Sequence, residues 1–138
     1  IIIGFPGETE EDFQQSIDTV ERLQFDNAFV FRYSKRRNTP AAEMDEQLTE
    51  PEKEDRNQRL LDVVNRIAKE KHAALVGSRQ QILCEGPSKN NASRLSGRTS
   101  QNKIVIFDGD ADRMTGQILD IQIEQSTGFT LYGTACLD

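Results

Sequence analysis

The apolar residues at the start of the chain follow the order strand, helix, strand. Ile1 to Ile3 are β-branched and uninterrupted, as is typical of a strand buried on both faces in a parallel sheet. Four apolar residues then recur at helical spacing between charged ones: Phe13, Ile17, Val20 and Leu23. The aromatic and β-branched stretch 27–33 predicts the next strand. This pattern indicates one right-handed strand-helix-strand unit of a parallel sheet or barrel.

A long helix follows an acidic connector. Thr49 to Glu52 has the capping-box pattern with a proline in the first turn, and apolar residues continue at helical spacing to Leu75. Gly77 suits the C-cap of this helix. We therefore predict two domains, residues 1–74 and 75–138.

Beyond Gly77 the apolar period shortens. Short alternating stretches predict five strands: 81–85, 94–98, 103–107, 118–123 and 129–133. Five glycines are expected to mark turns between them: Gly86, Gly97, Gly109, Gly116 and Gly128. The stretch 108–112 has neither the glycine nor the glutamate of a calcium loop and is predicted as a solvated hairpin. The fold class is α/β followed by all-β, the second part being a small five-stranded antiparallel barrel of the OB type.

A glycine-rich loop follows the first strand. It comprises Gly4, Phe5, Pro6, Gly7 and Glu8, and Thr9 is a suitable N-cap for the helix behind it. Ligands of α/β folds bind where strands end, so we expect this loop to bind one, mainly through backbone groups that a Cβ at Gly4 or Gly7 would obstruct. A plainer interpretation, that the glycines serve only the turn, stays open.

A second polar loop follows the second predicted strand. Its candidate ligand or RNA contacts, expected on the same rim as the first loop, are Tyr33, Ser34, Arg36 and Thr39. The alternative is that the basic triplet 35–37 is only a solvated turn.

Charge is unevenly distributed. The net charge of −6 argues against broad nucleic-acid affinity. However, residues 79–103 contain five basic residues against one acid, whereas residues 104–138 contain one against six. We predict a positive surface that binds RNA through a set of polar residues: Arg79, Arg94, Arg98, Asn102 and Lys103. For Arg98 and Asn102 an alternative is that they only hold a hairpin through hydrogen bonds.

Composition excludes several classes. No apolar run approaches the length of a membrane span, and Ile1 to Phe5 lacks the basic flank and the length of a signal peptide. Cys84 and Cys136 suit neither a disulfide framework nor a metal site and are expected to be small core residues. We expect a soluble, cytoplasmic and monomeric protein. Because the chain begins within a core strand and without Met, we interpret it as the C-terminal part of a longer one.

The loops resemble those of a known family. The Gly-Phe-Pro-Gly-Glu-Thr loop resembles the one that lies against adenosylmethionine in the methylthiotransferase branch of the radical S-adenosylmethionine enzymes. The second loop resembles the Tyr-Ser-Pro-Arg-Pro-Gly-Thr motif of that branch at Tyr33, Ser34, Arg36, Thr39, Pro40, Ala41 and Ala42. It departs from the motif at Lys35, Arg37 and Asn38, but Asn tolerates positive φ. The terminal module, residues 75–138, resembles a TRAM domain. Its stretch 97–107 resembles the corresponding stretch in those methylthiotransferases that modify tRNA.

This resemblance implies a transferase that replaces the C2 hydrogen of isopentenyl-adenosine, next to the anticodon of tRNA, with a methylthio group. It implies a partial (β/α) barrel of the radical S-adenosylmethionine fold, adenosylmethionine bound by Gly4 to Glu8, and two 4Fe-4S clusters. The cluster cysteines have no counterpart in this sequence, so the chain alone is expected to be inactive and to hold no metal. Two alternatives remain, a ribosomal-protein aspartate methylthiotransferase of the same family and a non-enzymatic RNA-binding module.

Overall fold

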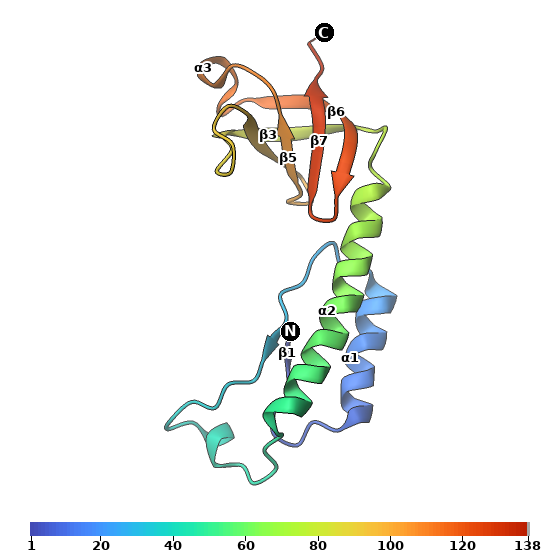
Figure 1. Ribbon diagram of the computed structural model, residues 1–138, viewed down its shortest axis with the longest axis vertical. Helices are drawn as coiled ribbons and strands as arrows, with labels where there is room; N and C mark the ends of the chain where they lie inside the picture. Colours follow the sequence, from blue (N-terminus) through green and yellow to red (C-terminus); the bar gives the residue numbers. More distant parts are fainter. Residues whose placement is uncertain (138) are drawn as a thin grey trace. The chain divides into compact units, whose positions relative to one another are not determined.

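The computed structural model of the chain describes residues 1–137 (Figure 1). It divides into two compact units, Ile1–Ile67 and Ala68–Asp138, and the division falls within helix α2 (Glu50–Ala73). Each unit has its own apolar core. Among the described residues, no helix is both long enough and apolar enough to cross a membrane.

The first unit contains the predicted strand-helix-strand arrangement. Strand β1 (Ile2–Ile3), helix α1 (Glu10–Leu23) and strand β2 (Phe31–Arg32) follow in order, and the two strands pair in parallel with Ile2 opposite Phe31. Strand β2 is shorter than the predicted stretch 27–33, because only its end pairs with β1 within the described chain. A short 3-10 helix, η1 (Pro40–Glu43), lies in the loop after β2.

Helices α1 and α2 lie side by side in this unit (Figure 1). Their apolar stripes and β1 form one core of fully or almost fully buried side chains: Ile3, Phe13, Val20, Leu60, Val64 and Ile67. Both predicted N-caps are confirmed. Thr9 forms a reciprocal capping box with Asp12, and Thr49 forms one with Glu52.

The end of the long helix was predicted too late. Helix α2 stops at Ala73, and Gly77, with φ of +88°, lies in the turn beyond it. The Gly77 N–H donates to the Ile123 carbonyl at 2.8 Å, and Leu75 packs against the core of the second unit. Leu75 therefore belongs to the packing of the second unit rather than to the helix.

The second unit is a closed five-stranded barrel, as predicted. Its strands are β3 (Arg79–Pro87), β4 (Leu95–Thr99), β5 (Ile104–Phe107), β6 (Ile118–Thr127) and β7 (Thr130–Ala135). They are hydrogen-bonded in the order β3-β4-β5-β7-β6. The expected antiparallel pairing is found between all neighbouring strands except β5 and β7, which are parallel. Strand β6 pairs with β3 instead of β5, so β7, returning from β6, fills the gap beside β5 in the parallel direction.

Two glycines predicted in turns lie within strands instead. A Cβ at Gly97 would lie 2.7 Å from the Leu83 carbonyl oxygen, and Gly86, with φ of +114°, follows a bulge in β3. In so small a barrel, glycine permits the close approach of neighbouring strands. The predicted hairpin 108–112 was also wrong. Asp110 caps a short helix there, α3 (Ala111–Met114), which connects β5 to β6.

Candidate functional site

The first loop turns tightly through its two glycines. Gly4 and Gly7 have φ of +72° and +84°, the left-handed values that favour glycine. Their N–H groups are engaged within the protein, since Gly4 donates to the Glu8 carboxylate at 3.0 Å and Gly7 donates to the Glu46 carbonyl at 2.9 Å. The backbone donors of these two glycines therefore fix the loop, which differs from the expectation that they face a ligand.

Glu8 is the centre of this loop. Its carboxylate accepts from Arg56 at 2.9 Å as well as from Gly4, and its carbonyl accepts from Arg56 at 2.8 Å. The side chains of Arg56 and Glu8 are only 10% and 12% exposed. A charged pair this well shielded holds the loop in one conformation, since breaking it would leave a charge without a partner.

Lys53 connects the two loops. A Cβ at Gly4 would lie 2.4 Å from Lys53 Cγ, so the lysine stem passes directly over the first loop. Its ammonium donates to the Tyr33 carbonyl at 3.3 Å in the second loop and pairs with Glu50 at 2.6 Å. The hydrogen bond from Lys53 lowers the pKa of Glu50.

Sequence reasoning missed both Lys53 and Arg56. Their signal was helical spacing, because they precede Leu60 by seven and four positions and so share the apolar face of α2. Both are almost fully buried. A cation that shares the apolar face of a helix, shortly after two polar loops in the sequence, indicates a side chain that is buried and paired rather than solvated.

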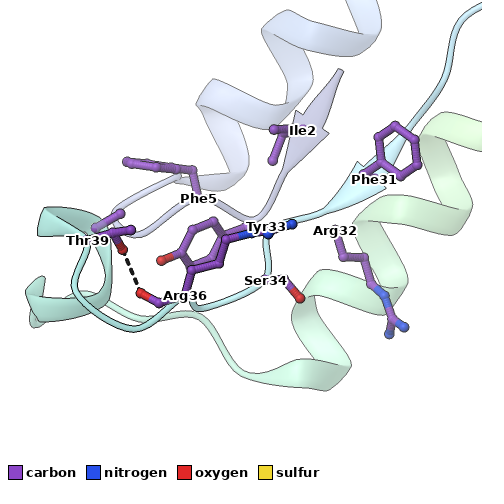
Figure 2. A pocket seen from close by; sticks show the side chains of 9 residues that line it. Ile2, Phe5, Phe31, Arg32, Tyr33, Ser34, Arg36 and Thr39 are labelled. Atoms are coloured by element: carbon purple, nitrogen blue, oxygen red, sulfur yellow. Dashed lines mark hydrogen bonds between the residues drawn. The ribbon is translucent and has the colours of Figure 1, made fainter.

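A pocket of about 780 Å³ lies where the two loops meet (Figure 2). It is lined by Ile2, Phe5, Phe31, Arg32, Tyr33, Ser34, Arg36, Thr39 and Ala41. The structure thus brings Phe5 of the first loop together with all four residues named from the second. The other residues of the first loop, Gly4, Pro6, Gly7 and Glu8, lie outside the lining.

Aromatic rings form the apolar wall of this pocket. Figure 2 shows Phe5 and Tyr33 side by side in the pocket. Their rings meet edge to face, with centroids 5.3 Å apart. The Tyr33 hydroxyl oxygen is buried and has no hydrogen-bond partner within the described chain. An unpaired buried hydroxyl is costly, so it marks a place where a ligand could supply the partner.

The far side of the pocket is a rigid turn. The Thr39 hydroxyl donates to the Arg36 carbonyl at 2.8 Å and accepts from the Ala42 N–H at 3.3 Å. Asn38 adopts φ of +62°, as expected for the residue that replaces glycine in the motif. With aromatic walls, one hydroxyl and the Arg36 side chain at the rim, the pocket suits a flat, partly polar ligand.

The basic residues of the barrel do not form one free patch. Arg79 pairs with Asp120 at 3.0 Å, Arg94 pairs with Asp108 at 2.8 Å, and Arg98 pairs with Glu85 at 3.4 Å. Arg98 also donates to the Asn102 side chain at 3.0 Å, the hairpin contact that was the alternative interpretation. Lys103 is buried.

A second pocket of about 750 Å³ lies on the barrel, and Arg94 and Arg98 line it. The other predicted RNA contacts, Arg79, Asn102 and Lys103, lie outside its lining. The sequence therefore identified two residues of this pocket and missed its apolar floor.

Neither cysteine is suited to a metal. Cys84 lies within the barrel core and Cys136 is half-buried, and both are free thiols. Within residues 1–137, no three His, Cys, Asp or Glu side chains come together as a candidate metal site.

The chain is similar to known proteins over almost its whole length. Residues 73–136 match the TRAM domain family. The chain is 62% identical over 99% of its length to a tRNA-2-methylthio-N(6)-dimethylallyladenosine synthase of Akkermansia muciniphila, and 49% identical over 97% to one of Methylacidiphilum infernorum. A third, of Natranaerobius thermophilus, is 47% identical over 96%. The chain spans about 30% of the length of these relatives and matches their C-terminal region.

Proposed function

Because the chain belongs to the family of tRNA-2-methylthio-N(6)-dimethylallyladenosine synthases, as their C-terminal part, we propose that it serves a tRNA-modifying methylthiotransferase. The reaction replaces the C2 hydrogen of the isopentenyl-adenosine beside the anticodon with a methylthio group. The observation that carries this proposal is the identity of 62% over 99% of the chain, which includes both the loops of the first unit and the barrel.

Within this proposal the first unit supplies part of the adenosylmethionine pocket. Residues 1–74 are the C-terminal portion of the radical S-adenosylmethionine domain, a partial (β/α) barrel, and the parallel pairing of β1 with β2 is consistent with this. Gly4 to Glu8 form the cofactor loop, in which Phe5 contacts the ligand while Glu8 and the glycines fix the backbone. The unpaired Tyr33 hydroxyl supports a ligand at this place.

The iron-sulfur clusters that the family resemblance implies do not fit the residues of this chain. A cluster needs several thiolates that converge on one point. Cys84 is 1% exposed and faces the barrel core among aliphatic side chains. We therefore derive no step of the radical chemistry from these residues; their part is to bind and orient the cofactor and the RNA.

The barrel, residues 75–138, is the RNA-binding part. Of the five predicted contacts, Arg94 and Arg98 line the barrel pocket and carry the hypothesis, whereas Arg79, Asn102 and Lys103 lie outside it. The proposed partner is tRNA, through its anticodon stem-loop. The TRAM match over residues 73–136 supports an RNA partner. A monomer in the cytoplasm completes the proposal.

Expression of the full-length protein in a bacterial strain without tRNA methylthiolation tests this function. Nucleosides from digested tRNA should regain the methylthio mass on isopentenyl-adenosine. A methylthio group on a ribosomal-protein aspartate, with unmodified tRNA, would establish the alternative enzyme of the same family. Modification of neither substrate, with RNA binding retained, would favour a binding module.

A further inference from the structure

The outer face of three barrel strands forms an ordered floor for the second pocket. Residues that alternate with the buried core point outward and are half-buried. Strand pairing aligns them in two rows, Arg98-Ile104-Thr130 and Ser96-Ile106-Tyr132. Each row runs from β4 through β5 to β7. The floor therefore has two adjacent isoleucines at its centre, with hydroxyls, an aromatic ring and a guanidinium around them.

The loop of residues 88–94 borders this floor. It is rich in serine and asparagine, but hydrogen bonds order it. The Ser88 N–H donates to the Arg94 carbonyl at 2.8 Å, and Asn91 accepts from the Ser93 hydroxyl at 2.6 Å. Lys89, Asn90 and Asn91 line the pocket from this side. Amides and hydroxyls at the edge of an apolar floor are groups that hydrogen-bond base edges.

Tyr132 and Arg94 form the polar end of the cleft. The Arg94 guanidinium lies 5.7 Å from the centroid of the Tyr132 ring. Arg94 is also held by Asp108, whose side chain is 80% exposed. At the other end, Arg98 is held by Glu85, and the two side chains are 40% and 47% exposed. Exposed ion pairs of this kind contribute little stability, so a phosphate can replace either carboxylate at small cost.

We propose that this cleft binds an unpaired nucleotide of the RNA substrate, with the base stacked on Tyr132 and adjacent phosphates bound by Arg94 and Arg98. The identity of the partner as RNA rests on the proposed function. Asp108 and Glu85 act as exchangeable partners that hold the two arginines in place until phosphates displace them.

The chemistry of the cleft favours an unpaired nucleotide over other anionic ligands. A base within a duplex has both faces covered by its neighbours, whereas a base in a loop can stack on an aromatic side chain. An acidic peptide would satisfy the two arginines but has no ring for Tyr132 and no use for the isoleucine floor. Barrels of the OB type bind oligonucleotides on the face of their second and third strands, which correspond here to β4 and β5.

The test measures binding of the full-length protein to a fluorescently labelled single-stranded RNA heptamer, without cofactor or turnover. Tyr132→Leu should weaken binding by roughly 5- to 100-fold, the range for loss of one stacked base. Tyr132→Phe keeps the ring and should bind within about twofold of the parent. Asp108→Asn should strengthen binding about two- to fivefold at low salt, because Arg94 no longer has a competing carboxylate. Asp120→Asn is the matched control, since Asp120 holds Arg79 outside the cleft and its loss should leave affinity unchanged.

Crosslinking locates the nucleotide independently of affinity. A heptamer that carries 5-bromouridine should crosslink to Tyr132 on irradiation, and mass spectrometry of the digest identifies the residue. Equal affinity of the parent and the folded Tyr132→Leu variant would overturn the proposal, as would a glutamate-rich peptide that binds the cleft in preference to the RNA. If such a protein still methylthiolates tRNA, the proposed function stands and only this site is lost.

Discussion

The shielded pair of Arg56 and Glu8 should decide whether the first loop keeps its conformation. Arg56→Ala removes both hydrogen bonds to Glu8 and leaves the Gly4 N–H as the donor to the Glu8 carboxylate within the loop. Loss of one partner from a buried pair costs about 3–5 kcal/mol. Because the two side chains are 10% and 12% exposed, we take the lower end, about 3 kcal/mol.

The cost should appear as local opening of the loop. A change of about 3 kcal/mol corresponds to a roughly 100-fold rise in the open population. Hydrogen exchange of the Gly4 amide, followed by mass spectrometry on peptides that cover residues 2–8, measures that population directly. Arg56→Ala should accelerate exchange by this factor at native pH.

Arg59→Ala is the matched control. Arg59 lies one turn further along α2, pairs with Glu10, and also lies over the Phe13 ring, 4.8 Å from its centroid against 5.8 Å for Arg56. Its pair is 38% and 57% exposed, so its loss should cost no more than about 1 kcal/mol. Equal acceleration of the Gly4 amide in the two variants would refute the reasoning, because it would show that shielding of the Glu8 pair adds nothing.

Three further outcomes are expected. Hydrogen bonds from Thr9 and Thr49 lower the pKa of Asp12 and Glu52 in the folded protein. The two carboxylates therefore stabilise the helix starts fully above the ordinary carboxyl pKa of roughly 4, and this stabilisation is lost as pH falls through the lower pKa values of the folded state. Circular dichroism at 222 nm should therefore decline in that acid range, and less so in an Asp12→Asn, Glu52→Gln variant. Gly133→Ala should destabilise the barrel by about 3 kcal/mol or more in urea unfolding, since the new Cβ would lie 2.1 Å from the Gln122 carbonyl oxygen. Gly116→Ala is the control: its Cβ would meet no atom within 4 Å, so it should cost only about 1 kcal/mol, for the strain of alanine at a φ of +80°. Gly7→Val, with φ of +84° and Glu46 in the way, should weaken adenosylmethionine binding in the full-length cluster-loaded enzyme, and unchanged affinity by calorimetry would argue against the cofactor loop.

Local chemistry predicted the elements better than their ends. The N-cap at Thr9, the capping box at Thr49 and the positive φ of Asn38 follow from side-chain chemistry within a few residues, and all three are confirmed. The glycines of the barrel were harder to interpret. Gly97 looks like a turn residue in the sequence, but its reason for being glycine is the Leu83 carbonyl, a neighbour that only strand pairing supplies.

The candidate site shows the same limit. The sequence predicted that Tyr33 and Thr39 lie near Phe5, because both loops follow strands and the ends of parallel strands meet at one edge. The pocket lining confirms this. The cations that hold these loops come from helix α2, far along the chain from their partners: Arg56 lies 48 residues after Glu8, and Lys53 lies 20 residues after Tyr33. Their burial depends on a tertiary contact that the charge of each residue does not reveal.

The basic residues of 79–103 and the acidic residues of 104–138 are separated along the chain but not in space. This changes the expected salt dependence of RNA binding. Strand pairing sets Leu95 opposite Phe107, so the basic residue before β4 meets the acid after β5, and the ion pair of Arg94 with Asp108 results. Lys103 is buried, so its substitution would test the fold rather than the RNA contact.

The informative variant is therefore Arg94→Ala with Arg98→Ala, compared with Arg79→Ala outside the cleft. Each phosphate contact to single-stranded RNA contributes about 0.7 to the salt slope, so the double variant should lower the slope by roughly 1.4, while Arg79→Ala should leave it unchanged. Filter binding across a salt series measures both slopes, and circular dichroism checks the fold. An unchanged slope in the folded double variant would mean that neither arginine exchanges its carboxylate for a phosphate, and any RNA affinity of the barrel would then have to come from stacking and hydrogen bonds alone.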